Sequence, residues 1–241
     1  MTERFRLTIV FDNYTCLEGF PTLWGFSAYI ETNRYTLLFD TGSNGRVLLQ
    51  NMERLGKNLQ KAQALFLSHP HWDHIGGVDS VLERHPDMHL FLPDSFSKHM
   101  IRDLRNQVSA LTIIGKEPQE LLPGLYSTGT MQSIGGPGEH AAIFDTSKGP
   151  VVVTGCAHPG IVAIARRATE ITGREIALLV GGFHLMYEDA DTITDVIDQL
   201  ESLGVASVCP THCSGDLAIE MFHEAFGKRA LAGGVGRVID L

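Results

Sequence analysis

The sequence predicts an α/β protein in which β-sheet packs against helices. Three runs near the amino terminus, 7–11, 25–31 and 35–39, are rich in β-branched and aromatic residues and are bounded by turn residues. From residue 48 onward, short apolar strands alternate with segments whose apolar residues recur at helical spacing. A β-rich beginning followed by β–α alternation is typical of a sheet with helices on its faces. Because the 241 residues contain no internal repeat or linker-like stretch, we expect one domain over 1–241.

The individual elements follow from apolar spacing and from helix caps. Residues 32–34 predict a hairpin turn, and the spacing of Leu48, Met52, Leu55 and Leu59 predicts a helix with one buried face. Further strands are expected at 64–67, 89–92, 151–154, 176–180, 205–209 and 235–239. Further helices are expected over 78–85, from a cap at Asp94 or Ser95 to about 107, over 161–171, from a cap at Asp191 or Thr192 to 203, and from a cap at Ser214 to 226. The Gly- and Pro-rich stretch 111–139 predicts irregular strands and loops.

Composition restricts the class of protein. The chain is 44% apolar and 20% charged, as in an ordinary globular protein, and its net charge is −9. Because no Lys- and Arg-rich stretch stands out, we expect neither nucleic acid nor membrane as a partner. The chain does not begin like a signal peptide, and its longest nearly apolar run, 176–186, is too short to cross a bilayer. We therefore expect a cytoplasmic protein.

The histidine count is unusual, whereas the cysteine count is not. Eleven histidines are a large share of the chain, and histidine is the commonest metal ligand. Four cysteines in a cytosolic protein of this size do not form a disulfide framework. Cys209 and Cys213 flank His212, so a zinc knuckle is an alternative interpretation of this segment. The sequence has no second Cys/His pair at the spacing of a zinc finger.

Polar and metal-binding residues follow five of the predicted strands directly. They lie in the segments 40–45, 68–74, 154–160, 181–184 and 210–215. In sheets covered by helices, ligands gather at the carboxyl ends of the strands. The histidines are therefore not scattered, and the pattern predicts one site.

The segment His69-x-His71-x-Asp73-His74 is the strongest signal for a metal site. In an extended segment, residues two apart share a face, so His69 and His71 can hold one ion. Asp73 and His74, in the turn that follows, can face a second ion. Each ion needs a third protein ligand, and we expect His158 and His212 to supply them. Three protein ligands leave an open position for water, which is typical of a catalytic site.

Several neighbours have predicted supporting roles. We expect Asp40 to orient a ligand histidine through its second ring nitrogen. His184 is either a substrate contact or proton donor or a satisfied core histidine, and His140 is a possible neighbour of the site. The remaining histidines are expected to be structural or solvated, namely His85, His89, His99 and His223.

These motifs resemble the metallo-β-lactamase superfamily. The resemblance covers essentially the whole chain and is carried by Phe39-Asp40-Thr41-Gly42, by the block 68–77, and by His158 and His212. The chain is most similar to a branch marked by the segments 154–161, 181–185 and 210–215. Members of this branch are commonly described as metal-dependent hydrolases. One characterised activity there is a transferase of methanopterin biosynthesis, which joins a dihydropterin methyl diphosphate to a ribofuranosyl-aminobenzene phosphate and releases diphosphate.

The resemblance implies an αββα four-layer sandwich, with two mixed sheets face to face, helices outside and the metals at one edge. By the same resemblance, His69, His71 and His158 hold one metal, and Asp73, His74 and His212 hold the other. The chain departs from the superfamily at Cys156, because hydrolases of the superfamily usually have a bridging aspartate in a Gly-Asp pair there. Cys156 is either a metal ligand or a small buried residue, and the second metal site is expected to be weaker, filled by another metal, or empty.

The first functional prediction is a metal-dependent hydrolase with a metal-activated water, acting on an ester- or phosphoester-type small molecule that can be anionic. Asp73 would orient the water. The alternative is the pterin transferase, in which the metals bind the leaving diphosphate; a third reading is a non-catalytic, metal-stabilised module. Two divalent ions are expected. Zinc is the default for this donor set, and manganese, iron or nickel also fit. The sequence names neither the substrate nor the oligomeric state.

Overall fold

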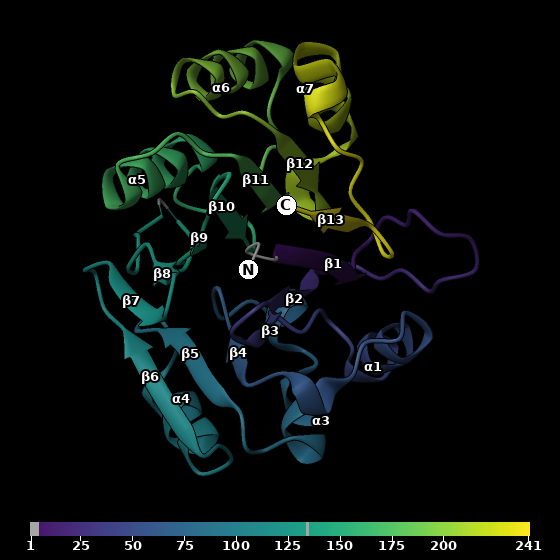
Figure 1. Cartoon of the computed structure of the whole chain (residues 1–241), viewed down its shortest axis with the longest axis vertical. Helices are drawn as coiled ribbons and strands as arrows, with labels where there is room; N and C mark the ends of the chain where they lie inside the picture. The colour runs from purple at the N-terminus through teal and green to yellow at the C-terminus, as the bar shows by residue number, and fades with distance from the viewer. Residues whose placement is uncertain (1–4, 134) are drawn as a thin grey trace. The chain divides into compact units, whose positions relative to one another are not determined.

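The computed structural model describes residues 5–133 and 135–241, and Figure 1 shows its elements. The chain divides into two compact units. Unit 1 comprises Met1–Gly115 and Gly234–Leu241, and unit 2 comprises Lys116–Gly233. Each unit contains one β-sheet with its own helices. The predicted single domain over 1–241 stays a prediction.

Unit 1 is built on a seven-stranded mixed sheet in the order β13-β1-β2-β3-β4-β5-β6. Strands β13, β1, β2 and β3 pair antiparallel, whereas β3 to β6 run parallel. The strands are β1 (Phe5–Phe11), β2 (Ser27–Thr32), β3 (Thr36–Phe39), β4 (Ala64–Phe66), β5 (His89–Pro93), β6 (Ala110–Ile114) and β13 (Val238–Asp240). Phe39 pairs with Phe66, so the carboxyl ends of β3 and β4 lie side by side.

The helices of unit 1 cover an apolar core. They are α1 (Gly45–Arg54), α2 (Trp72–Ile75), α3 (Val78–Arg84) and α4 (Lys98–Arg105), with the 3-10 turn η1 (Leu59–Lys61). Residues from these helices pack with one face of the sheet, including Leu48, Val81 and Leu104 against Leu38 and Leu65. Apolar residues recur at helical spacing in these segments because one face of each helix is buried in this core.

Two predicted helix boundaries in unit 1 are wrong. The first helix ends at Arg54 instead of Leu59, because Gly56 takes a left-handed φ of 67° and the N–H of Lys57 returns to the carbonyl of Met52. Leu59 is buried, but it belongs to the separate turn η1. The cap of α4 is Ser97, whose side chain accepts a hydrogen bond from the N–H of Met100.

Unit 2 is built on a six-stranded mixed sheet in the order β12-β11-β10-β9-β8-β7. Strands β10, β11 and β12 run parallel, and β7 to β10 pair antiparallel. The strands are β7 (Gln119–Leu122), β8 (Leu125–Ser127), β9 (Ala142–Thr146), β10 (Gly149–Thr154), β11 (Leu178–Gly182) and β12 (Val208–Thr211). β10 and β11 are buried along their whole length, as is typical of parallel strands covered on both faces.

Among the described residues of unit 2, the helices beside the sheet are α5 (Ile161–Thr172), α6 (Ala190–Ser202) and α7 (Asp216–Phe226). The 3-10 turns η2 (His212–Ser214) and η3 (Gly227–Arg229) flank α7. Figure 1 shows α6 and α7 side by side beyond β11 and β12. Their apolar faces meet the sheet in one core, with Phe183 packed edge-on against Phe222 at 5.4 Å between ring centroids.

Two predicted caps in unit 2 are also wrong. Asp189, not Asp191 or Thr192, caps α6 by accepting the N–H of Thr192. Ser214 cannot cap α7, because its hydroxyl donates to the carbonyl of Thr211 and accepts the N–H of Phe183. Gly215 precedes α7 instead.

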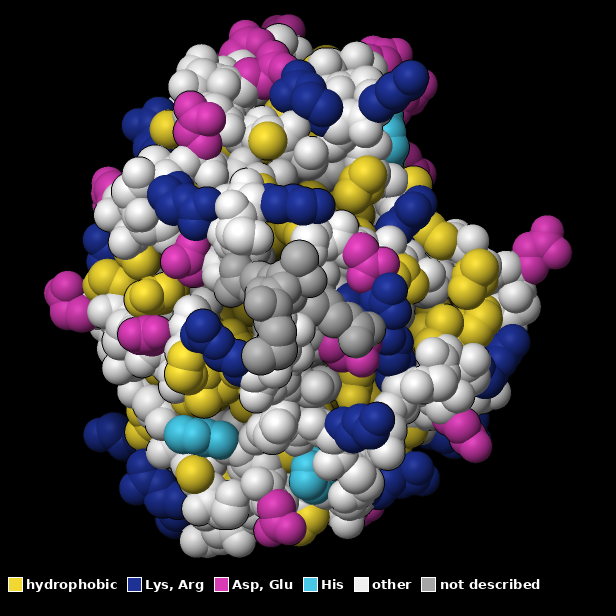
Figure 2. All heavy atoms as spheres, in the orientation of Figure 1, with side chains coloured by type: hydrophobic (Ala, Val, Ile, Leu, Met, Phe, Trp, Pro, Cys, Tyr) yellow, Lys and Arg dark blue, Asp and Glu magenta, His cyan; other side chains and the backbone are white. Residues whose placement is uncertain are grey.

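The two mixed sheets with their helices confirm the predicted α/β fold class. The irregular strands and loops expected over 111–139 are the end of β6, then β7 and β8 with a register shift between them, and the loops that connect them, whereas β9 was not predicted. On the face shown in Figure 2, basic side chains lie among acidic ones. Within the described residues, each helix is too short or too polar to cross a lipid bilayer.

Candidate metal centre

The candidate ligands fall into two clusters, one in each unit. The cluster of unit 1 follows β4 and continues into α2, and that of unit 2 follows β10, β11 and β12. Unit 1 contributes Asp40, His69, His71, Asp73 and His74, and unit 2 contributes His140, Cys156, His158, His184 and His212.

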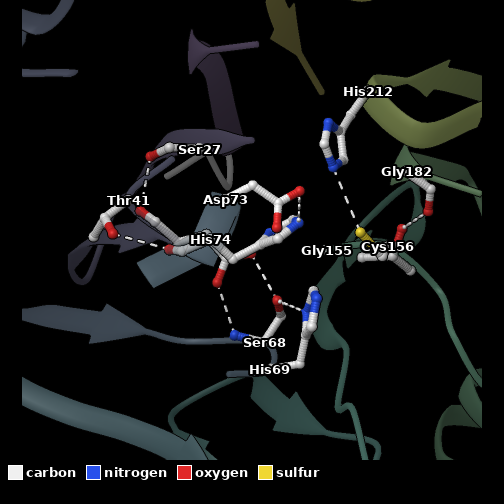
Figure 3. A network of polar contacts seen from close by, with 12 residues as sticks. Ser27, Thr41, Ser68, His69, Asp73, His74, Gly155, Cys156, Gly182 and His212 are labelled. Carbon is white, nitrogen blue, oxygen red and sulfur yellow. Dashed lines mark hydrogen bonds and ion pairs between the residues drawn. The ribbon is translucent and has the colours of Figure 1, made fainter. Parts of the chain in front are cut away.

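In unit 1, the three histidines that follow β4 converge. The ring centroid of His69 lies 4.7 Å from that of His71 and 4.3 Å from that of His74. His71 keeps an extended backbone and precedes α2, which carries Asp73 and His74. Oδ2 of Asp73 lies 3.6 Å from Nε2 of His74 (Figure 3). The spacing of the motif therefore brings all four side chains to one end of β4.

A buried polar network orients two of these rings. Oδ2 of Asp40 lies 2.7 Å from Nδ1 of His74, and Oδ1 accepts the N–H of Ser68 at 2.7 Å. The hydroxyl of Ser68 donates to Asp40 and lies 2.9 Å from Nδ1 of His69 (Figure 3). These contacts place the ring protons of His69 and His74 on Nδ1, which leaves Nε2 of each ring as the metal-binding nitrogen. This is the arrangement that the role predicted for Asp40 requires.

The backbone around this network is closely packed. The N–H and the hydroxyl of Thr41 both donate to the carbonyl of His74, at 2.7 and 2.9 Å. A Cβ at Gly77 would lie 2.5 Å from the carbonyl oxygen of Thr41, so glycine is required for this approach. Asp40 itself has a φ of 51°, which is uncommon outside glycine. The loops after β3 and β4 are thus fixed against each other.

In unit 2, adjacent parallel strands deliver the candidate residues. His158 follows β10, His184 follows β11, and His212 follows β12. Ala157, His184 and His212 have φ values of 61°, 55° and 52°. Such conformations cost of order 1–3 kcal/mol each and are found mostly at functional sites. Three strained residues at one sheet edge therefore favour a functional role for these loops.

Glu139 is a residue that the sequence analysis missed. Its fully buried carboxylate accepts four backbone N–H groups, with Oε1 bonded to Gly155, Cys156 and Ala157 and Oε2 bonded to His158. Hydrogen bonds to an ionised acceptor are stronger than neutral ones. Glu139 therefore holds the loop that carries Cys156 and His158. Its position beside the noted His140 was the only available signal, and it gave no indication of this contact.

Cys156 lies in contact with a candidate ligand. Its Sγ is 3.5 Å from Nε2 of His212 (Figure 3), and the thiol of Cys213 donates to the Cys156 carbonyl at 3.5 Å. Burial alone raises the pKa of Cys213, but the hydrogen bond with Cys156 and the neighbouring His212 and His184 lower it, so the pKa lies well below that of a free thiol. The hydrogen bond with Cys213 in turn raises the pKa of His184.

His184 and His140, whose roles the sequence left open, have different surroundings. His184 is exposed, and its ring centroid lies 4.3 Å from that of His158. His140 is fully buried, and its Nδ1 lies 2.8 Å from the hydroxyl of Ser127. His184 therefore lies next to a candidate ligand, as its predicted role as a substrate contact or proton donor requires. His140 instead makes a buried contact with the hydroxyl of Ser127.

Both clusters fit a divalent ion. Ligand atoms at about 2.0–2.3 Å from a tetrahedral ion lie roughly 3.3–3.8 Å from one another. The 3.6 Å between Asp73 and His74 and the 3.5 Å between Cys156 and His212 both fall in this range. Imidazole, carboxylate and thiolate are also the donors that zinc prefers.

A cavity of about 510 Å³ in unit 2 adjoins these residues. It is lined by the loops after β10 and β11, including His158 and His184, and by the facing sides of α5 and α6. Its wall is mainly apolar, with Arg166 on α5 hydrogen-bonded to Gln199 on α6 at 2.9 Å. A volume of this size can hold a small organic molecule.

Comparisons with known proteins relate the chain to the metallo-β-lactamase superfamily. The sequence model of the metallo-β-lactamase superfamily matches residues 25–223. A 7,8-dihydropterin-6-methyl-4-(beta-D-ribofuranosyl)-aminobenzene-5'-phosphate synthase of Methanocaldococcus jannaschii is 27% identical, over 83% of each chain. A solved metal-dependent hydrolase of the β-lactamase superfamily has a TM-score of 0.81 at 24% identity, over 98% of this chain and 99% of the other. The metallo-β-lactamase fold protein YhfI of Bacillus subtilis has a TM-score of 0.72 at 16% identity, over 99% and 100%.

Proposed function

The chain belongs to the metallo-β-lactamase superfamily, and on that premise we propose that it is a metal-dependent hydrolase acting on an ester- or phosphoester-type small molecule. The observation that carries the proposal is the buried network in which Asp40 and Ser68 leave Nε2 of His69 and His74 available for a metal. A network of this kind is typical of histidines that bind a metal.

The proposed ligand sets use both clusters. One ion would be held by His69, His71 and His158, and the other by Asp73, His74 and His212. The assignment rests on the resemblance to the superfamily and is supported by the convergence of the rings within unit 1 and by the fixed loops of unit 2. Zinc is the default ion for this donor set, with manganese, iron and nickel as alternatives.

Ions bound there would polarise the scissile bond and lower the pKa of a water molecule. The residues of the chain would then orient the reactants. Asp73 would hold the water through a carboxylate oxygen, and His184 would contact the substrate or donate a proton to the leaving group. His184 suits this role because it is exposed, has its ring centroid 4.3 Å from that of His158 and lines the cavity of unit 2.

The cavity suggests the chemistry of the substrate. Its apolar wall favours a molecule with an apolar portion, and the guanidinium of Arg166, which lines the cavity together with the carboxylate of Glu188, favours a negative charge beside it. We therefore propose a small anionic ester or phosphoester. No nucleic-acid or membrane partner is proposed, since the net charge is −9.

Hydrolysis of bis(p-nitrophenyl) phosphate by the zinc-loaded protein tests this function. We expect hydrolysis that a chelator abolishes and zinc restores, and that His71→Ala lowers by more than about 100-fold, since even residues outside the ligand set cost 10- to 100-fold. The matched control is His99→Ala, because His99 is an exposed residue of α4. Full activity and full metal content in His71→Ala would overturn the site assignment.

A transferase that releases diphosphate is the second candidate. It is favoured by the similarity to the synthase from Methanocaldococcus jannaschii and by Cys156, which stands where hydrolases of the superfamily usually have a bridging aspartate. Incubation with a dihydropterin methyl diphosphate and a ribofuranosyl-aminobenzene phosphate distinguishes the two. Release of diphosphate only when both compounds are present would favour the transferase, and no release would exclude it.

A further inference from the structure

A sulfur-containing group of potential metal ligands lies entirely within unit 2. Cys156, His184 and Cys213 each offer one ligand atom, and these atoms lie within 4.8 Å of one another. The three residues come from the loop after β10, the loop after β11 and the 3-10 turn η2. Both cysteines are buried, whereas His184 is exposed.

The fold keeps these atoms together. A Cβ at Gly182 would lie 2.6 Å from Sγ of Cys213, so the glycine leaves the room that the sulfur occupies. The thiol of Cys213 donates to the carbonyl of Cys156, whose own N–H is held by Glu139. His184 reaches the group from a backbone with a φ of 55°. The juxtaposition is therefore fixed by the backbone of three adjacent strand ends.

The separations suit a small ion. The ligand atoms of two thiolates and an imidazole on one tetrahedral ion are roughly 3.5–3.8 Å apart. Because the two sulfurs and the ring nitrogen already lie within 4.8 Å of one another, only small side-chain movements would bring them to these distances. Thiolate donors select soft or borderline ions such as Zn²⁺ and Cd²⁺ over Mg²⁺ or Ca²⁺. His184 is the exposed member of the group and also lines the cavity of unit 2.

We propose that Cys156, His184 and Cys213 form a Cys₂His site for a thiophilic divalent ion, separate from the ligand sets of the proposed hydrolase. Binding forms two metal–sulfur bonds and one metal–nitrogen bond, and releases to solvent whatever protons the two sulfurs and the coordinating ring nitrogen carry beforehand. Three protein ligands leave a fourth position for water or for a donor atom of a bound molecule. The site shares no residue with the two ligand sets of the proposed hydrolase, but it uses His184, which would then act as a metal ligand instead of as a substrate contact or proton donor.

Titration of the reduced full-length chain with Co²⁺ tests the proposal through the thiolate-to-cobalt charge-transfer absorption. The titration uses a Cys16→Ser background, since Cys16 is partly exposed. We expect the band to fall to about half in Cys156→Ser and in Cys213→Ser, and to vanish when both are changed. Cys209→Ser is the matched control, because Cys209 is buried in β12 and belongs to no potential metal-binding group among the described residues. His71→Ala should keep the full band.

Three results would overturn the site. They are the absence of a band, a band that Cys213→Ser leaves unchanged, and a band that Cys209→Ser removes. Should the serine variants fail to fold, the ¹¹³Cd resonance of the parent chain gives the number of sulfur ligands directly, and a shift typical of nitrogen and oxygen ligands alone would contradict the proposal. Loss of phosphodiester hydrolysis with retention of the cobalt band would count against the hydrolase alone.

Discussion

Oδ2 of Asp40 lies 2.7 Å from Nδ1 of His74, and both side chains are fully buried. The same carboxylate oxygen accepts the hydroxyl of Ser68, which in turn contacts His69. One carboxylate at the end of β3 therefore orients two imidazoles that follow β4. The parallel pairing of these strands, with Phe39 opposite Phe66, is what brings the three residues together.

We expect Asp40→Asn to weaken zinc binding by about 10- to 100-fold, because an amide cannot accept the ring proton of His74 and that of Ser68 as a carboxylate does. Asparagine tolerates the φ of 51°, so the backbone should be retained. Competition with a chromophoric chelator measures the affinity. Asp87→Asn, an exposed change in the same unit, is the control. Equal zinc affinities in the two variants would remove the orienting role of Asp40.

Replacement of Glu139 tests the anchor of the loop in unit 2. In Glu139→Gln, an amide NH₂ faces at least one backbone N–H that the carboxylate now accepts, and the negative charge is lost. We expect the free energy of unfolding to fall by about 2–4 kcal/mol, since a hydrogen bond to a charged group contributes about 1.5–3 kcal/mol and an unsatisfied buried donor adds to the loss. Urea unfolding measures the change.

The control for this substitution is Glu224→Gln, because Glu224 is an exposed residue of α7. Its effect should stay within about 0.5 kcal/mol. A destabilisation no larger in Glu139→Gln than in Glu224→Gln would show that the four hydrogen bonds contribute little.

Arg166 tests the substrate proposed for the cavity. We expect Arg166→Ala to raise KM for an anionic phosphodiester by about two- to fivefold with little change in kcat, because an exposed charge pair contributes up to about 1 kcal/mol. A neutral ester such as p-nitrophenyl acetate should be unaffected. Arg105→Ala, on the exposed side of α4, is the matched control. Equal changes in KM for the anionic and the neutral ester would argue against charge recognition in this cavity.

His89 predicts a pH dependence of stability that is independent of the metal site. Burial lowers the pKa of its imidazole, which stacks on Phe91 and bonds the hydroxyl of Thr112. The folded state therefore binds its proton less readily than the unfolded state. The stability from this group is present above about pH 6.5 and is lost as the pH falls through the folded pKa.

Urea unfolding at several pH values measures this effect. The free energy of unfolding should fall more steeply below pH 6.5 in the parent chain than in His89→Gln, with the difference between the two curves assigned to His89. Parallel curves for the two proteins would contradict the lowered pKa.

Much of the fold could be predicted from local pattern. The apolar spacing of α5 and α6 and the hairpin turn between β2 and β3 have strong local signals, and the match of the family model confirms the superfamily resemblance drawn from the block 68–77. The ends of the helices were harder to predict from the sequence. The hydroxyl of Ser214 is hydrogen-bonded to residues outside α7, and Gly56 ends α1 although the apolar spacing continues to Leu59. Strand β9 gave too weak a signal, since its place depends on pairing with β8 and β10.

Some residues of the candidate site could likewise be predicted from local sequence, whereas others could not. The ligand-type residues of the motif 69–74 are adjacent in sequence, so their convergence could be predicted. Glu139 could not be found, because its role depends on four backbone N–H groups that lie 16 to 19 residues away in the chain. The group of Cys156, His184 and Cys213 likewise depends on the order of three strands in the sheet.

The most direct test of the central claim is a crystal structure of the zinc-loaded protein with anomalous data recorded at the zinc edge. The proposal of a metal-dependent hydrolase predicts one anomalous peak bound by His69, His71 and His158 and another bound by Asp73, His74 and His212. The absence of zinc from Nε2 of both His69 and His74 in fully loaded, active protein would contradict it.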